Sequence, residues 1–240
     1  MTTNILQLGS IEALIIRKLV KNLHLSVLPP LGKVRVTAPE GMKDDAIRTL
    51  LATRLPWIKK QQEKFQGQVR QTKREYVSGE SHYFFGQRYR LEAVYKEAAP
   101  VVYLKGKSKI VLQVRPNSSA QKRCEVLMDW YRKELQPVAE KLMDKWQKEL
   151  KLQAKSWKIQ RMKTRWGTCN NKTGRILLNL ELAKKPIACL EYVIVHELLH
   201  MIEKKHNENF VSMLAKYIPK WKSTKEELNR LILSHEEWNY

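Results

Sequence analysis

The segment from Tyr192 to His200, which reads YVIVHELLH, constrains this chain more than any other. On a helix, residues four apart lie one above the other, so His196 and His200 would present two imidazoles to one metal ion. Glu197 would lie beside that ion. Two histidines and an adjacent carboxylate supply what hydrolytic zinc requires, namely ligands, an open position and a base for the attacking water.

A pattern with only three fixed letters also arises by chance, so its context matters. Apolar residues recur around it at helical spacing, and these are Leu190, Val193, Ile194, Leu198, Met201 and Ile202. Pro186 stands where the first turn is expected. The pattern predicts a buried helix that presents its histidines inward.

Catalytic zinc usually keeps three protein ligands, and His206 is the best candidate for the third. It follows His200 by six residues, which on a continuous helix would turn it by roughly 240° onto the wrong face. If His206 is a ligand, the helix must end between Glu203 and Lys205, and Asn207 could cap the next helix. The alternative is that His206 is a solvated loop histidine.

Four motifs occur in the order found in one known family. They are RWGTC at 165–169, ILLN at 176–179, YVIVHELLH at 192–200 and HNENF at 206–210. In this order the chain resembles the YgjP-like metal-dependent hydrolases, which are zincin-type proteins related more loosely to the SprT-like metalloproteases. The resemblance extends over nearly the whole chain.

The resemblance implies a zinc site with His196, His200 and His206 as ligands and Glu197 as general base. Thr168 stands where the family commonly has Ser. Glu203 stands where the similarly spaced metzincin motif has Gly, so metzincin geometry is not implied.

The composition is that of a globular protein with a strong positive charge. The net charge of +21 is spread along the chain: Lys and Arg number 28 against 15 Asp and Glu in the first 150 residues, and 17 against 9 in the rest. Such a charge favours polyanions, including nucleic acid, although many basic proteins bind nothing specific. We find no membrane-length apolar run, no signal-peptide pattern and no CxxC pair, and therefore expect a cytoplasmic protein without a membrane partner.

We expect an α+β fold with a β-rich N-terminal part at 1–116 and a helix-dominated, zincin-like catalytic part at 117–240. Strands are predicted at 12–18, 22–27, 33–37, 88–95, 101–104, 109–115, 157–163 and 175–180. Long helices are predicted from Asp44 or Asp45 to about Lys64, with a kink or restart at Pro56, and over 120–152. The polar segment 67–73 is a candidate linker, and no repeat period is evident.

The motif does not determine the substrate. The leading hypothesis is a zinc-dependent metallopeptidase, which could act on protein bound to nucleic acid. A second is a nucleotide phosphohydrolase of the nucleoside triphosphate pyrophosphatase type, because Arg161, Lys163 and Arg165 alternate along a predicted strand and could bind phosphate. A solvated strand face is an equal interpretation of these residues. A third is a nucleic-acid-binding protein with a structural metal, although such a site has no need of Glu197.

Overall fold

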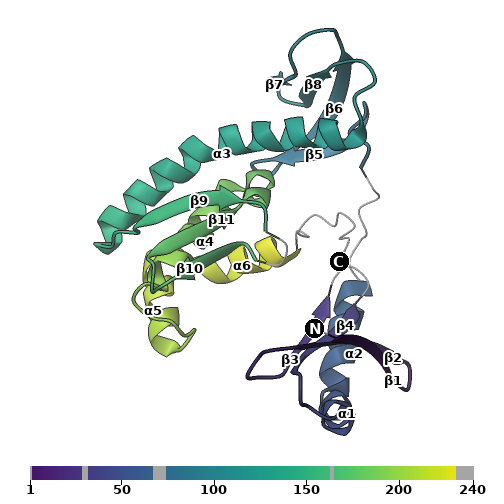
Figure 1. The fold of residues 1–240 in the computed structure, drawn as a ribbon. Helices are drawn as coiled ribbons and strands as arrows, with labels where there is room; N and C mark the ends of the chain where they lie inside the picture. Colours follow the sequence, from purple (N-terminus) through teal and green to yellow (C-terminus); the bar gives the residue numbers. More distant parts are fainter. Residues whose placement is uncertain (1, 29–31, 67–73, 163–164, 231–240) are drawn as a thin grey trace. The chain divides into compact units, whose positions relative to one another are not determined.

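The computed structural model describes residues 2–28, 32–66, 74–162 and 165–230. These residues form two compact units that divide between residues 72 and 73. Helices and mixed sheets occur in both units, which confirms the α+β prediction (Figure 1). The segment 67–73, the predicted linker, lies outside the described residues.

The first unit is a four-stranded sheet followed by two helices. Its elements are β1 (Thr2–Leu8), β2 (Ile11–Lys18), β3 (His24–Leu28), β4 (Lys33–Pro39), α1 (Asp44–Thr53) and α2 (Leu55–Gln66). Alternate residues of β2 and β4 are buried together with Ile47, Leu51 and Ile58 of the helices, so one sheet face makes the core. The predicted restart at Pro56 is confirmed, since α1 ends at Thr53 and α2 begins at Leu55. Proline is tolerated at this position because it lies in the first turn of a helix.

The second unit carries two sheets and the remaining helices. The first sheet and its helix are β5 (Ser81–Phe84), β6 (Gln87–Tyr95), β7 (Val101–Lys105), β8 (Lys109–Val114) and α3 (Ala120–Leu150). The rest comprises β9 (Ser156–Gln160), β10 (Gly167–Asn170), β11 (Arg175–Asn179), the 3-10 helix η1 (Leu180–Lys184), α4 (Ile187–Leu199), α5 (Glu208–Tyr217) and α6 (Trp221–Arg230).

The two four-stranded sheets share one topology. Their strand orders are β1-β2-β4-β3 and β5-β6-β8-β7. In each, the outer pairs are antiparallel and the central pair is parallel. Corresponding turns hold Gly9 and Gly86, and then Gly32 and Gly106, all at positive φ. A ββββα module therefore occurs twice, although the sequence shows no repeat period.

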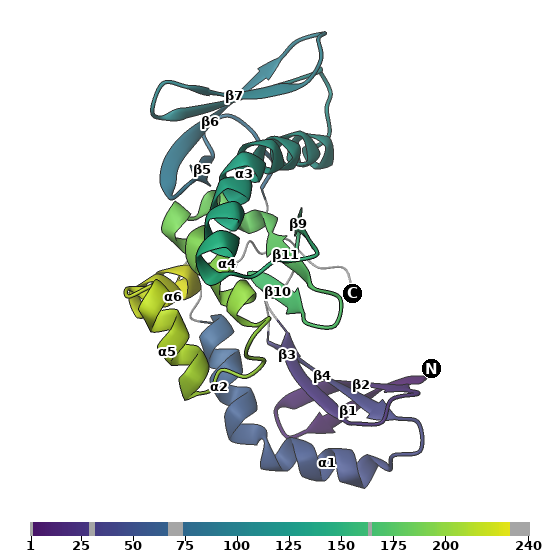
Figure 2. The same ribbon diagram turned by 90° about the vertical axis from the view of Figure 1, so that its left-hand side faces the viewer.

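The compact units divide at a different point from the sequence-based boundary between residues 116 and 117. The reason is that β5–β8 shares one continuous core with α3 and the later elements, including Phe84, Leu91, Leu112, Leu127 and Tyr131. In Figure 1, α3 runs from the β5–β8 sheet to the β9–β11 sheet. Helix α4 is surrounded by α3, β10 and β11, α5 and α6 (Figure 2).

Candidate metal centre

Helix α4 is the central helix of the second unit. It is buried on almost every side, as expected of a helix that is apolar all round. Pro186 is its N-cap, and a Cβ on Gly86 would lie 2.8 Å from the Pro186 ring. The backbone N–H of Phe85 donates to the Ala183 carbonyl at 2.9 Å. The β5–β6 turn thus braces the start of the helix that carries His196.

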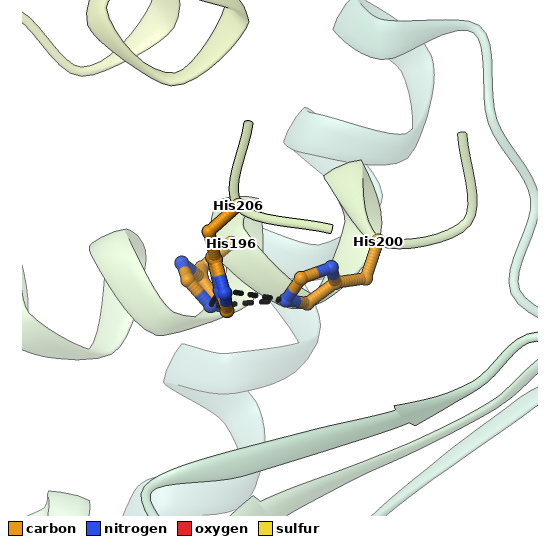
Figure 3. Close-up of side chains that lie close together, drawn as sticks. All are labelled: His196, His200 and His206. Carbon is orange, nitrogen blue, oxygen red and sulfur yellow. Dashed lines mark hydrogen bonds between the residues drawn. The ribbon is translucent and has the colours of Figure 1, made fainter. Parts of the chain in front are cut away.

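Three histidine side chains converge at the end of α4 (Figure 3). His196 lies on the helix, His200 is its C-cap, and His206 lies just before α5. Their Nε2 atoms lie 3.2 Å apart for His196 and His200, 3.1 Å for His200 and His206, and 3.0 Å for His206 and His196. The three residues are therefore brought together as the sequence predicts.

This triangle of nitrogens fits a metal ion. Tetrahedral ligands at the usual Zn–N distance of about 2.0–2.1 Å lie about 3.3 Å from one another. Burial, and then the neighbouring His200 and His206, lower the pKa of His196 to about 3. Burial also lowers the pKa of His206. Both imidazoles are thus neutral at pH 7 with lone pairs available, which is the form that binds metals.

His206 can reach the other two histidines because helix α4 ends before it. Helix α4 ends at Leu199, before the range 203–205 expected from sequence. The side-chain amide of Asn171 donates to the His200 carbonyl, which supplies a hydrogen bond at the helix end. The Nδ1 of His200 lies 3.0 Å from the Glu203 carbonyl. That contact places a proton on Nδ1 and leaves the Nε2 lone pair facing the other two imidazoles.

The predicted cap of the next helix is present. The Asn207 side chain accepts from the Phe210 backbone N–H at 3.0 Å, so α5 begins at Glu208. Phe210 is buried, and its ring centroid lies 4.7–5.0 Å from those of all three histidines. The cap therefore fixes an apolar side chain against the imidazole cluster.

Glu197 is held close to strand β10. It is only 6% exposed, and burial raises the pKa of its carboxyl to about 7, an effect that the charge of Arg165 reduces. A Cβ added to Gly167 would lie 2.7 Å from the Glu197 Oε1 and Cγ atoms. Only glycine lets the strand backbone pass this close to the carboxylate.

The site opens into a cleft of about 530 Å³ that lies within the second unit. It is lined by His196, Glu197, His206, Arg165, Trp166, Gly167, Tyr192, Val193, Phe210, Val211, Leu214, Trp221, Lys225 and Leu228. The contributions of α6, among them Trp221 and Lys225, were not predicted from sequence. No local pattern marks them, because they join the cleft only through tertiary packing.

The three basic residues proposed for substrate binding differ in their position relative to the cleft. Strand β9 ends at Gln160, so the predicted alternating face does not reach Arg161 or Arg165. Arg165 lines the cleft, whereas Arg161 is not among its lining residues. Lys163 lies outside the described residues.

Asn179 explains why β9 ends early. Its buried side-chain amide donates to the carbonyls of Met162 at 2.9 Å and Arg165 at 2.7 Å. Its side-chain oxygen accepts from the backbone N–H groups of Met162 at 3.3 Å and Glu181 at 3.2 Å. One buried side chain thus holds both described ends of the segment that leads to Arg165 and Trp166.

Comparisons with known proteins identify the family of this chain. A family model for metallopeptidase domains matches residues 21–231, which is most of the chain. The class that fold and site define is that of the metal-dependent hydrolases. The chain belongs to the YgjP-like family, which confirms the resemblance seen in the motifs.

The similarity of this chain to a solved structure is limited. The crystal structure of the metallopeptidase zymogen abylysin of Pyrococcus abyssi matches with 21% identity and a TM-score of 0.35, over 38% of this chain and 90% of that one. At this overlap the likeness carries no argument. A comparison with curated proteins found no match. Within the described residues, no helix combines the length and the apolar character needed to cross a membrane.

Proposed function

We propose that this protein is a zinc-dependent metallopeptidase in which His196, His200 and His206 hold the metal and Glu197 is the general base. The observation that carries the proposal is the triangle of Nε2 atoms, 3.0–3.2 Å apart, beside a buried carboxylate. An all-nitrogen set of three protein ligands is typical of catalytic zinc, because a fourth position stays open.

A zinc ion at this position would polarise the scissile carbonyl and acidify water. Glu197 supports the reaction by holding and moving a proton. With a pKa raised to about 7, its carboxylate can accept a proton from the attacking water and then donate it to the leaving amine. The close approach of Gly167 restricts where this carboxylate can lie.

Strand β10 supports an extended peptide as the substrate. It is an outer strand of the sheet ordered β10-β11-β9, and Gly167 at its start lines the cleft. An outer strand can bind an extended chain through backbone hydrogen bonds. We therefore propose that a substrate segment pairs along β10 and passes its scissile bond beside Glu197.

The nucleotide alternative has less support. Of its three predicted phosphate-binding residues, only Arg165 lines the cleft among the described residues. The net charge of +21 supports a nucleic-acid-bound protein as substrate only through general attraction to polyanions. We retain both as arms of the experiment.

The test of the site is zinc content after removal of each predicted ligand. His206→Ala should lose most of its zinc under conditions where the wild type holds one ion per chain. His24→Ala, which alters an exposed histidine of the first unit, should remain fully loaded. Full zinc occupancy in His206→Ala would remove the third ligand from the proposal.

The test of the substrate is a panel incubated with zinc-loaded wild type. Unfolded proteins with and without DNA are compared with nucleoside triphosphates. We expect cleavage of the proteins alone. Hydrolysis restricted to the triphosphates would overturn the peptidase proposal, and stimulation by DNA that disappears at high salt would support a nucleic-acid-bound substrate.

A further inference from the structure

The cleft is lined by side chains of two different chemical kinds. The reactive and charged ones include His196, His206, Glu197 and Arg165. Beside them the lining is largely apolar, with contributions from α4, α5 and α6. These apolar residues are Val193, Phe210, Val211, Leu214, Trp221 and Leu228.

The apolar wall is built before any ligand arrives. Val193, Phe210, Leu214 and Leu228 are 1–3% exposed, so each is fixed by packing in the core of the second unit. Trp221 is half-buried and packs against the same core. A preformed apolar wall next to reactive groups favours an apolar ligand group, because water there has few partners.

Two cations stand among the lining residues. They are Arg165 and Lys225. The Lys225 Nζ lies 5.8 Å from the ring centroid of Trp221. Among the described lining residues Glu197 is the one acidic side chain. The cleft therefore favours a ligand with negative charge.

We propose that the wall of α4, α5 and α6 is a subsite for one bulky apolar side chain of the substrate, next to the scissile bond, and that Lys225 and Arg165 bind a carboxylate of the same peptide. This rests on the proposed peptidase function and names its substrate class. The cleft volume of about 530 Å³ is within the range of about 300–1,000 Å³ typical of ligand sites, so a large side chain and a neighbouring residue can enter together.

The first test changes only the peptide. Zinc-loaded wild type is given matched peptides whose central residue is Leu, Phe or Ala and whose neighbour is Asp or Lys. We expect kcat/KM to be at least about tenfold higher for Leu or Phe than for Ala. Peptides whose neighbouring residue is Asp should also have a higher kcat/KM than those with Lys, and the ratio of the two values should fall as salt is added. Equal rates for Leu, Phe and Ala would overturn the subsite.

The second test reverses one charge. Lys225→Glu should reverse the preference between Asp and Lys while the ratio of Leu to Ala stays unchanged. Lys216→Glu, an exposed lysine of α5 outside the cleft lining, is the matched control and should behave as wild type. An unchanged Asp preference in Lys225→Glu would contradict the role of this lysine.

A binding measurement separates failure of the subsite from failure of the peptidase proposal. Glu197→Gln, loaded with zinc, is titrated with the same peptides. If wild type cleaves none of them but the variant binds Leu-Asp more tightly than Ala-Lys, the subsite stands and the peptidase proposal fails. If peptides are cleaved without preference and bound without preference, the subsite is wrong and the peptidase proposal stands.

Discussion

Single residues set the tolerances of this site, and Gly167 does so most directly. The backbone of β10 passes so close to Glu197 that a methyl group on Gly167 would lie 2.7 Å from the Cγ and Oε1 atoms of Glu197. The conformational freedom of glycine is not what matters here. What matters is that Gly167 has no side chain, because a Cβ at this position would also lie 2.8 Å from the Cγ1 atom of Val193.

Gly167→Ala should therefore reduce peptide hydrolysis without loss of zinc. We expect a drop of at least about tenfold, because displacement of a general base by about 1 Å is costly. Gly41→Ala is the control, since a Cβ there meets nothing within 4 Å. Wild-type rates in Gly167→Ala, with zinc bound, would show that the close approach has no catalytic meaning.

His82 should make stability depend on pH. Burial, and then the charges of Arg74 and Lys184, lower its pKa from 6.5 to about 3. The His82 Nε2 lies 3.1 Å from Arg74 NH1 and 3.2 Å from the Glu80 Oε2, so both a cation and a carboxylate lie beside this buried ring. The unfolded chain takes up this proton below about pH 6.5, and the folded protein does so only near pH 3. The contribution of His82 to the free energy of unfolding is therefore fully present above pH 6.5 and is lost as the pH is lowered toward 3.

The test compares unfolding free energies at pH 7 and pH 5 in wild type and His82→Asn. The decrease in unfolding free energy from pH 7 to pH 5 should be about 2 kcal/mol smaller in His82→Asn than in wild type. Any metal release at pH 5 affects both proteins alike. The same loss in both would show that His82 does not carry the effect.

At the scale of elements, sequence patterns predicted what local rules determine. The strands β6 to β8, the long helix α3 and the cap at Asn207 follow from alternation, helical spacing and capping chemistry. The ends of β9 and α4 were predicted too late, because Asn179 and Asn171 end these elements through hydrogen bonds from distant segments. The pairing of β1 and the repeated sheet topology depend on tertiary contacts, which no local pattern records.

Asn179→Ala should show that one amide positions the segment before β10. It would leave the carbonyls of Met162 and Arg165 without that donor, at a cost of about 3 kcal/mol in the free energy of unfolding. Well below the melting temperature, KM should rise more than kcat falls, because Arg165 and Trp166 line the cleft. A lower melting temperature with unchanged KM would make Asn179 purely structural.

At the scale of the whole molecule, the site belongs to one unit. All three histidines, Glu197 and every described residue that lines the cleft lie in residues 73–234, which have their own core. The first unit has a separate core built on the same ββββα topology. Metal binding and the role of the first unit are therefore separable questions.

A fragment of residues 73–234 should bind one zinc ion with the affinity of the full chain. Zinc titration of the two proteins, with circular dichroism to confirm that the fragment folds, provides the measurement. A folded fragment that binds zinc at least tenfold more weakly would show that the first unit contributes to the site.

The most direct measurement of the central claim is hydrolysis of an unfolded protein by wild type and Glu197→Gln at equal zinc content. We predict that the variant loses activity by a factor of about 10²–10⁴, as expected when a general base is removed, while it keeps its zinc. Glu208→Gln, an exposed carboxylate at the start of α5, should retain full activity. Equal hydrolysis by wild type and Glu197→Gln would contradict the account, because the buried carboxylate beside the three histidines would then have no part in the reaction.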